Sequence, residues 1–260
     1  MIKLAANLTM MFSDRPFLDR IDAAADAGFK GVECLMPYEA PAEAIAERLQ
    51  RRGLELVLFN FAVGDWGAGD RGIGANPARQ GEFAASLEQG LTYARATGCK
   101  QLHIMAGKIG ADDDRAAWTE TFVRNIQTAA DAAAGDGIDI MLEPINTRVD
   151  IPGYYYDTTD AAVAIMDAVG RSNVKLQYDV YHMQIMQGDL VRRFEQLQSR
   201  IGHIQIADNP GRNEPGTGEI NYPFVLSRLE ALGYDGWIGC EYRPVGDTVA
   251  GLAWAKPYLS

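Results

Sequence analysis

The sequence predicts one α/β domain, a single (β/α)8 barrel over residues 1–260, and two observations support this prediction. Short apolar stretches with the two-residue period of strands alternate with longer stretches of helical periodicity along the whole chain. Several later strand stretches end in an oxygen-bearing side chain, and a barrel brings such strand ends to one mouth. A doubly wound open sheet is the alternative, but no G-x-G-x-x-G motif follows the first strand stretch.

Residues 138–146, IDIMLEPIN, are predicted to form the strand that defines this mouth. Apolar residues occupy every second position from Ile138 to Leu142, so Glu143 falls on the opposite face. Pro144 has no N–H to donate to a neighbouring strand, so the strand should stop there. We therefore expect Glu143 at the C-terminal end of a buried strand, where barrel proteins bind their ligands.

Three later strand stretches place Asp179, Gln205 and Glu241 near their C-terminal ends on the inward face. The three stretches are 174–180, 202–208 and 237–242. With Glu143 they form an all-oxygen set, which suits Mg²⁺ or Mn²⁺ better than zinc. Without a bound cation the converging carboxylates would repel one another and raise their own pKa values, so we expect a divalent metal site.

The other elements follow from periodicity and from residues that begin or end helices. Asp14 is expected to cap the first helix, with Pro16 in its first turn, and Gly28, Gly53 and Gly98 are expected to end helices. Strands are expected at 2–8, 31–38, 54–61 and 101–107, and helices at 14–27, 41–52, 78–98, 112–134, 159–169, 189–198, between Asn221 and Gly233, and at 247–259.

Two long irregular segments, 63–77 and 146–160, interrupt this alternation. Segment 63–77 is rich in glycine and long for a connection within a compact domain, and such loops are usually functional or disordered. One interpretation is a lid in which Trp66 covers the site with an apolar ring. The other interpretation is a solvated surface loop.

Composition limits the class of protein and its partners. The net charge of −11 argues against a nucleic-acid partner, since nucleic-acid binders carry basic patches. No apolar run approaches the roughly 20 residues of a membrane span, and the start lacks a signal-peptide pattern. The three cysteines are far apart and odd in number, which indicates reduced, buried thiols in a cytosolic protein. The sequence leaves open whether the chain forms a homo-oligomer.

The glutamates Glu143 and Glu241 are expected on nearly opposite strands, where they could flank a flat substrate. One could remove a proton from the carbon next to a carbonyl group, and the other could return it to the neighbouring carbon. A divalent ion would act as a Lewis acid toward the carbonyl oxygen and stabilise an enediolate. This combination predicts an isomerase, and the sequence does not show which glutamate is the base in which direction.

The three histidines are expected at different positions relative to the site. His182 follows the expected ligand Asp179 by three residues, which favours a substrate contact over an ordinary loop histidine. His203 has the inward parity of Gln205 but lies one layer deeper, so we expect it to be buried in support of the site or the core. His103 is also expected inside the barrel.

A small acidic substrate would need donors for its carboxylate. Arg212, Lys108 and Arg243 lie just past strand ends and could each hold it by charge-assisted hydrogen bonds, with Arg212 preferred and Lys108 next. Each could instead be a solvated surface charge. Asn7 has inward parity at the end of the first strand, so Asn7 and Trp66 complete the predicted substrate contacts.

The whole chain resembles the hydroxypyruvate isomerases of the xylose-isomerase-like barrel superfamily. The resemblance is carried by six segments: AANLTMMF (5–12), GDWGAGDRGI (64–73), LEPIN (142–146), QYDVYHMQ (177–184), HIQIADNPGRNEPGTGEINYP (203–223) and GWIGCEYRP (236–244). It implies reversible conversion of hydroxypyruvate to 2-hydroxy-3-oxopropanoate (tartronate semialdehyde). It also implies Glu143 and Glu241 as the proton donor and acceptor, and Mg²⁺ held by Glu143, Asp179, Gln205 and Glu241.

Four other classes of protein share the barrel or parts of these segments. The 2-oxo-tetronate isomerases share most of these segments, although Lys108 and the segments IADNPGR and DIPGYYY are nearer to the hydroxypyruvate enzymes. Ketose 3-epimerases usually show histidine where Gln205 stands. A zinc endonuclease for abasic DNA would need more than the three histidines present, and a non-catalytic sugar-binding module would not need the carboxylates.

Overall fold

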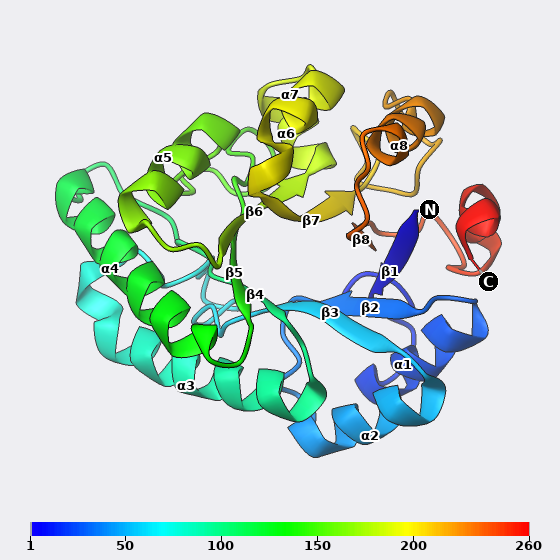
Figure 1. The fold of residues 1–260 in the computed structure, drawn as a ribbon, viewed down its shortest axis with the longest axis horizontal. Coiled ribbons are helices and arrows are strands. Elements are labelled where there is room, and N and C mark those ends of the chain that lie inside the picture. The colour runs from blue at the N-terminus through cyan, green and yellow to red at the C-terminus, as the bar shows by residue number, and fades with distance from the viewer. Residues whose placement is uncertain (1, 260) are drawn as a thin grey trace.

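The computed structural model describes residues 2–259, and its strands form a closed parallel barrel in the order β1 to β8 (Figure 1). The strands are β1 (Lys3–Asn7), β2 (Gly31–Cys34), β3 (Glu55–Asn60), β4 (Gln101–His103), β5 (Asp139–Leu142), β6 (Val174–Asp179), β7 (Ile201–Ile206) and β8 (Trp237–Cys240). The predicted (β/α)8 barrel is therefore confirmed. The predicted domain also included residues 1 and 260, which lie outside the described part.

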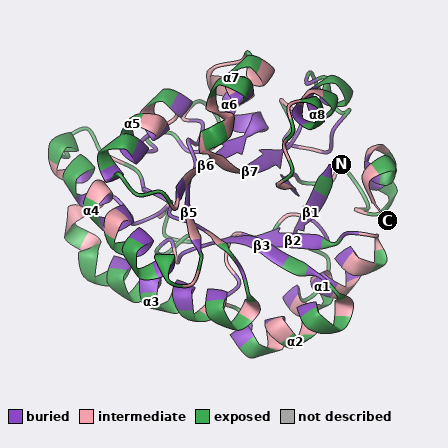
Figure 2. Cartoon of the chain, viewed as in Figure 1, coloured by how far each residue is buried: buried purple, intermediate pink, exposed green. Residues whose placement is uncertain are grey.

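Helices surround the barrel, and their outer faces are exposed, while the strands are buried over most of their length (Figure 2). The α-helices are α1 (Phe17–Asp26), α2 (Ala42–Arg52), α3 (Gln80–Thr97), α4 (Arg115–Ala134), α5 (Thr159–Val169), α6 (Val180–Met186), α7 (Leu190–Leu197) and α8 (Tyr222–Ala231). Three 3-10 helices cover Pro77–Arg79, Gln198–Arg200 and Ala250–Tyr258.

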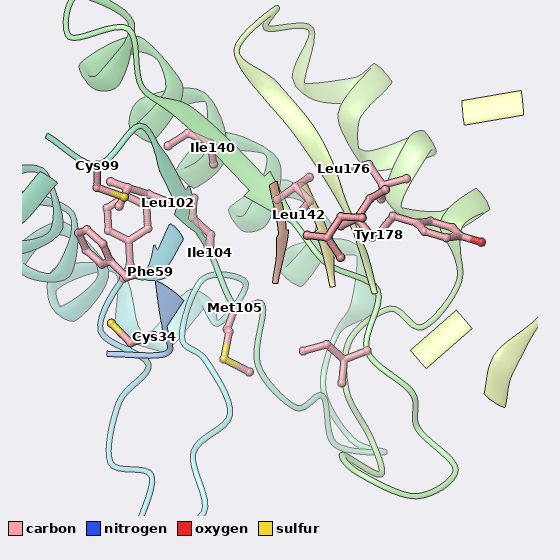
Figure 3. Close-up of a cluster of buried hydrophobic side chains, with 14 of the residues drawn as sticks. Cys34, Phe59, Cys99, Leu102, Ile104, Met105, Ile140, Leu142, Leu176 and Tyr178 are labelled. Atoms are coloured by element: carbon pink, nitrogen blue, oxygen red, sulfur yellow. The ribbon is translucent and has the colours of Figure 1, made fainter. Parts of the chain in front are cut away.

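Two apolar layers hold the barrel together. The larger layer lies between strands and helices, where Phe59, Leu102, Ile140 and Leu176 pack in one cluster (Figure 3). The smaller layer fills the barrel interior and consists of Ala5, Val57, Leu58 and Met141, with Trp237 packed against it. Because Ile140 and Met141 belong to different layers, the predicted alternation of faces along β5 is confirmed.

Three details differ from the sequence-based prediction. Helix α1 begins at Phe17 after Pro16, while Asp14 pairs with the adjacent Arg15 and caps nothing, because the proline occupies the cap position. The expected closing helix at 247–259 is a 3-10 helix, and Pro257 lies inside it. A short helix, α6, was not predicted, and it begins directly at the end of β6.

Register places the predicted metal ligands at one end of the barrel. Asp179 is the last residue of β6 and pairs directly with Gln205 of β7. Glu143 and Glu241 each come one residue after β5 and β8. Within residues 2–259, no helix is long and apolar enough to cross a membrane.

The N-terminus of α4 offers a test of the local structure. Asp114 accepts hydrogen bonds from the backbone N–H groups of Ala116 (2.9 Å) and Ala117 (3.3 Å). We expect Asp114→Ala to lower the free energy of unfolding by about 1 kcal/mol and the Tm by about 2–4 °C, measured by thermal unfolding. Asp112→Ala, at an exposed turn position, is the matched control, and equal Tm values for the two variants would contradict the capping role.

Candidate active site

A cavity of about 1050 Å³ opens where the strands end. Most of the site residues predicted from the sequence line it: Asn7, Trp66, Glu143, His182, Gln205, Arg212 and Glu241. Asp179 is fully buried beside them, with its Oδ2 at 3.7 Å from His182 Nε2. The predicted mouth is therefore a pocket of at least the size that usually holds a small metabolite.

Asp179 has two structural tasks. Its Oδ1 accepts hydrogen bonds from the backbone N–H groups of Tyr181 (2.7 Å) and His182 (3.2 Å), so it is the N-cap of α6. Its Oδ2 is buried and has no hydrogen-bond partner among the described residues. The same carboxylate therefore begins the helix that carries His182 and leaves one oxygen directed at the site.

Hydrogen bonds fix the tautomer of His182. Asn146 Oδ1 accepts from the Val149 N–H at 2.9 Å, so the Asn146 amide nitrogen faces His182 Nδ1 at 2.7 Å. An amide nitrogen only donates, so Nδ1 accepts and Nε2 carries the hydrogen. Burial lowers the pKa of His182 to about 4, so the ring is neutral at pH 7.

The His182 Nε2–H points toward two carboxylates. Nε2 lies 3.6 Å from Glu143 Oε1 and 3.7 Å from Asp179 Oδ2. Ligand atoms of these three residues lie within 4.8 Å of one another. A metal ligand needs a lone pair at the nitrogen that faces the ion, and here that nitrogen carries a hydrogen. The geometry therefore favours a hydrogen bond from His182 to substrate over direct metal ligation.

The carboxylates repel one another in a buried space. Two unit charges no more than 4.8 Å apart cost at least about 3 kcal/mol at an effective dielectric constant near 20. Burial, with Glu241 and Asp179 nearby, raises the pKa of Glu143 well above its usual range. Burial and Asp179 raise the pKa of Glu241 to about 8, although Arg212 lowers it. A further cation at this place would favour the ionised forms of Glu143 and Glu241.

Arg212 is the cation in direct contact with this cluster. Its guanidinium lies 3.0 Å from Glu241 Oε2, 3.8 Å from Asp179 Oδ2 and 3.0 Å from Asp150 Oδ1. The guanidinium also lies 5.1 Å from the centroid of the Tyr181 ring. Its backbone has φ = +53°, a left-handed conformation that costs an arginine about 1–3 kcal/mol. The surrounding ion pairs hold this residue in place despite that cost.

The donor set fits the predicted divalent metal. Glu143 Oε1 and Asp179 Oδ2 are both buried oxygens without hydrogen-bond partners in residues 2–259. Such groups are costly to bury unless an unseen partner satisfies them. Oxygen ligands and an excess of negative charge suit Mg²⁺ or Mn²⁺. Gln205 and Glu241 line the same cavity as Glu143, and Gln205 is the register partner of Asp179.

The other two histidines are buried inside the barrel, as expected. His103 Nδ1 lies 3.3 Å from Asn60 Oδ1 and 3.6 Å from Glu143 Oε2, and burial lowers its pKa to about 3. His103 therefore lies beside the Glu143 carboxyl group as a neutral ring and adds no positive charge there. His203 Nε2 lies 2.7 Å from Glu33 Oε2, away from the cavity lining.

Of two residues predicted to contact substrate from loops, Trp66 lines the cavity and Lys108 does not. Trp66 lines the cavity and stacks on Arg71, whose guanidinium carbon lies 3.8 Å from the ring centroid. The Arg71 guanidinium donates to the backbone oxygens of Trp66 (3.2 Å) and Asp70 (2.6 Å), so segment 63–77 is internally bonded near the site. Lys108 is exposed and does not line the cavity, so the structure gives no support to a substrate contact there.

Sequence reasoning missed several residues of the site. Gln177 lines the cavity, Asp150 binds Arg212, and Glu33 lies fully buried behind Gln205. The sequence contained a signal for Glu33, because a charged residue inside the short apolar stretch GVECL needs a buried partner. Asp150 gave no such signal, since it lies in an irregular loop.

The fold and the acidic cavity define a barrel protein with a site at the carboxyl ends of its strands. Residues 21–258 match the family model described as xylose isomerase-like TIM barrel. The chain therefore belongs to the xylose isomerase-like TIM barrel family.

Its relatives show that the protein is an isomerase. The 2-oxo-tetronate isomerase of Cupriavidus necator is 49% identical over 100% of this chain and 99% of its own length. The hydroxypyruvate isomerase of Escherichia coli is 43% identical over 99% of this chain and 100% of its own length.

Solved structures agree on the fold. A Brucella melitensis crystal structure described as "AP endonuclease, family 2" has a TM-score of 0.97 and 48% identity, covering 100% of both chains. The 3-keto-D-glucoside 4-epimerase of E. coli has a TM-score of 0.82 at 20% identity, covering 98% of this chain and 100% of its own. The second similarity shows a shared fold alone.

Metal binding should depend on pH, because Glu143 and Glu241 have raised pKa values. In the metal-free protein, protonated Glu143 and Glu241 stabilise the folded state at pH values below the usual pKa of a carboxyl group. This stabilisation is lost as the pH rises through the raised pKa values that the two groups have in the folded state. Protons compete with the metal for these carboxylates more strongly at pH 5 than at pH 8. We expect Mg²⁺ or Mn²⁺ to raise the Tm more at pH 8 than at pH 5, and EDTA to reverse the increase.

The matched variants are Glu143→Gln and, as a control, Glu195→Gln on the exposed face of α7. The first should lose most of the metal-induced increase in Tm, and the second should keep it. An equal increase in Tm for both variants would contradict metal binding at Glu143.

Proposed function

We propose that this isomerase shifts a carbonyl group between neighbouring carbons of a short hydroxy-oxo acid, with metal assistance. The reaction converts a 2-oxo-3-hydroxy acid into its 2-hydroxy-3-oxo isomer, and hydroxypyruvate with 2-hydroxy-3-oxopropanoate is the three-carbon case. The observation that carries the proposal is the cluster of buried carboxylates at the cavity, two of which, Glu143 and Glu241, have raised pKa values. Carboxyl groups that line one cavity can act as general base and general acid toward a substrate bound between them.

The residues of the chain have separate tasks in this reaction. Glu143, Asp179, Gln205 and Glu241 would hold Mg²⁺ or Mn²⁺, which supplies a Lewis acid for the substrate carbonyl. One of the two glutamates takes the proton from the hydroxyl-bearing carbon, and the other delivers a proton to the former carbonyl carbon. The hydroxyl proton passes to the former carbonyl oxygen, so that the new carbonyl and hydroxyl groups are both complete.

The remaining cavity residues orient the substrate. The His182 Nε2–H donates to an oxygen of the substrate, because its Nδ1 is committed to Asn146. Arg212 is the proposed partner of the substrate carboxylate, since its guanidinium already binds carboxylate oxygens of Asp150 and Glu241. Both donors lie beside the proton-transferring groups, so a bound acid would place its reacting carbons near them.

A four-carbon substrate is the second candidate. 2-Oxo-tetronate carries the same 2-oxo-3-hydroxy group with one further hydroxymethyl group. The 2-oxo-tetronate isomerases of C. necator and Pectobacterium atrosepticum are 49% and 46% identical to this chain, compared with 43% for the E. coli hydroxypyruvate isomerase. The cavity of about 1050 Å³ has room for the longer acid.

The description of the Brucella structure suggests endonuclease activity as an alternative. Two observations argue against it for this chain. The net charge of −11 disfavours the phosphate backbone of DNA. The three histidines are also too few for a zinc cluster, because His103 and His203 contact Asn60 and Glu33 inside the barrel.

Removal of either glutamate should stop proton transfer. We expect Glu143→Gln and Glu241→Gln each to lower kcat by about 10²–10⁴-fold, because glutamine has a similar shape but exchanges no proton. Steady-state assays with hydroxypyruvate measure this effect, and circular dichroism checks the fold. Glu195→Gln is the surface control, and near-normal turnover by either site variant would remove that residue from the proton-transfer pair.

Deuterium exchange tests the reaction and the substrate together. Protein incubated with hydroxypyruvate in D₂O and Mg²⁺ should incorporate deuterium into the substrate and form the aldehyde isomer, as followed by NMR, and EDTA should stop both. A higher kcat/KM for 2-oxo-tetronate would transfer the assignment to the four-carbon acid. Absence of exchange with both acids in folded, metal-loaded protein would contradict the proposed chemistry.

A further inference from the structure

Glu33 is a buried carboxylate that the proton-transfer chemistry does not use. It lies on β2 and is fully buried. Its Oε1 accepts hydrogen bonds from Asn7 Nδ2 (2.9 Å) and Gln205 Nε2 (2.8 Å), and its Oε2 lies 2.7 Å from His203 Nε2. Strands β2 and β7 are not neighbours in the barrel, so the bonds to Gln205 and His203 cross its interior.

These bonds decide which end of the Gln205 amide faces Glu33. The Gln205 nitrogen donates to Glu33, and its oxygen accepts from Gln177 Nε2 at 2.6 Å. A flipped amide would place its oxygen against the carboxylate and its nitrogen against another nitrogen. The flip would lose two hydrogen bonds, of which the one to a charged group contributes about 1.5–3 kcal/mol. Glu33 therefore holds the Gln205 amide with its nitrogen toward Glu33 and its oxygen on the opposite side.

The glycine at position 239 is a second observation, because it leaves room for the Glu33 carboxyl group. It lies on β8, and a Cβ atom at this position would overlap the Glu33 carboxyl group. Gly239 is not among the glycines with positive φ, so its backbone would accept another residue. The space that Glu33 occupies is therefore the reason for glycine at position 239.

We propose that Glu33 is a positioning residue that presents the Gln205 amide oxygen to the divalent cation of the proposed active site. The two ends of a carboxamide have nearly the same shape, so only its hydrogen-bond partners determine which end faces an ion. Glu33 Oε1 accepts from Gln205 Nε2, so it selects the nitrogen and leaves the other end of the amide, the oxygen, for the cation. This inference rests on the metal site of the proposed function. Partners of this kind typically change metal affinity by about 10–100-fold.

The experiment measures Mn²⁺ affinity of the purified full chain, from the electron paramagnetic resonance signal of free Mn²⁺. We expect Glu33→Ala to raise the Kd for Mn²⁺ by about 10–100-fold, because the Gln205 amide then loses the bond that holds its nitrogen and keeps only the bond from Gln177. Glu33→Gln should raise the Kd by less than about tenfold, since its amide oxygen still accepts from Gln205. A loss in Glu33→Gln equal to that in Glu33→Ala would overturn the positioning role, because charge would then be the cause.

Gly239→Ala tests the same contact from the other side. The added methyl group should displace the Glu33 carboxylate and weaken Mn²⁺ binding in the wild-type background. In the Glu33→Ala background the space is empty, so Gly239→Ala should add little. Losses that simply add in the double variant would show that the two residues act independently and would overturn the inference.

Two controls keep the results separable. Circular dichroism and Tm values establish that each variant is folded, and Gly239→Ala provides the test if Glu33→Ala does not fold. Wild-type protein that binds no Mn²⁺ would overturn the inference together with the proposed metal site. Wild-type protein that binds Mn²⁺ with the expected differences among variants, but isomerises neither acid, would support the inference and overturn the proposed reaction alone.

Discussion

The structure depends most on the burial of several carboxylates at the mouth of the barrel. Glu143, Asp179 and Glu241 approach one another with little exposure to solvent, and Arg212 contacts Asp179 and Glu241. Burial of an unbalanced charge is among the most unfavourable arrangements in a protein. The rest of the barrel makes it possible, because eight paired strands and a continuous apolar layer outside them fix the strand ends.

This constraint also explains the neighbours of the cluster. His103 and His182 are neutral because burial disfavours their charged forms, so they offer hydrogen bonds and no compensating charge. Arg212 is held in a left-handed backbone conformation by ion pairs with Asp150 and Glu241. Arg212 offsets part of the repulsion among the buried carboxylates, and the divalent cation proposed above would reduce it further.

Sequence patterns predicted the barrel and the places of its strand-end residues, because the side-chain period of a strand reports which face a residue occupies. Alternation along β5 and β6 was sufficient to place Glu143 and Asp179 at the mouth. The pattern could not show which side chains meet across the barrel, and Glu33 and His203 are separated by 170 positions. Helix α6 was also missed, since its seven residues are too few to display helical periodicity.

The double engagement of Asp179 has a consequence for how such a site can change during evolution. One of its oxygens begins a helix and the other lies beside His182 and Arg212, so folding and the proposed chemistry share a single side chain. Exchange of this carboxylate for an imidazole ligand would require another group to satisfy the first N–H groups of α6. New metal preferences are therefore more accessible at Gln205, whose backbone lies within a strand and whose side chain caps nothing.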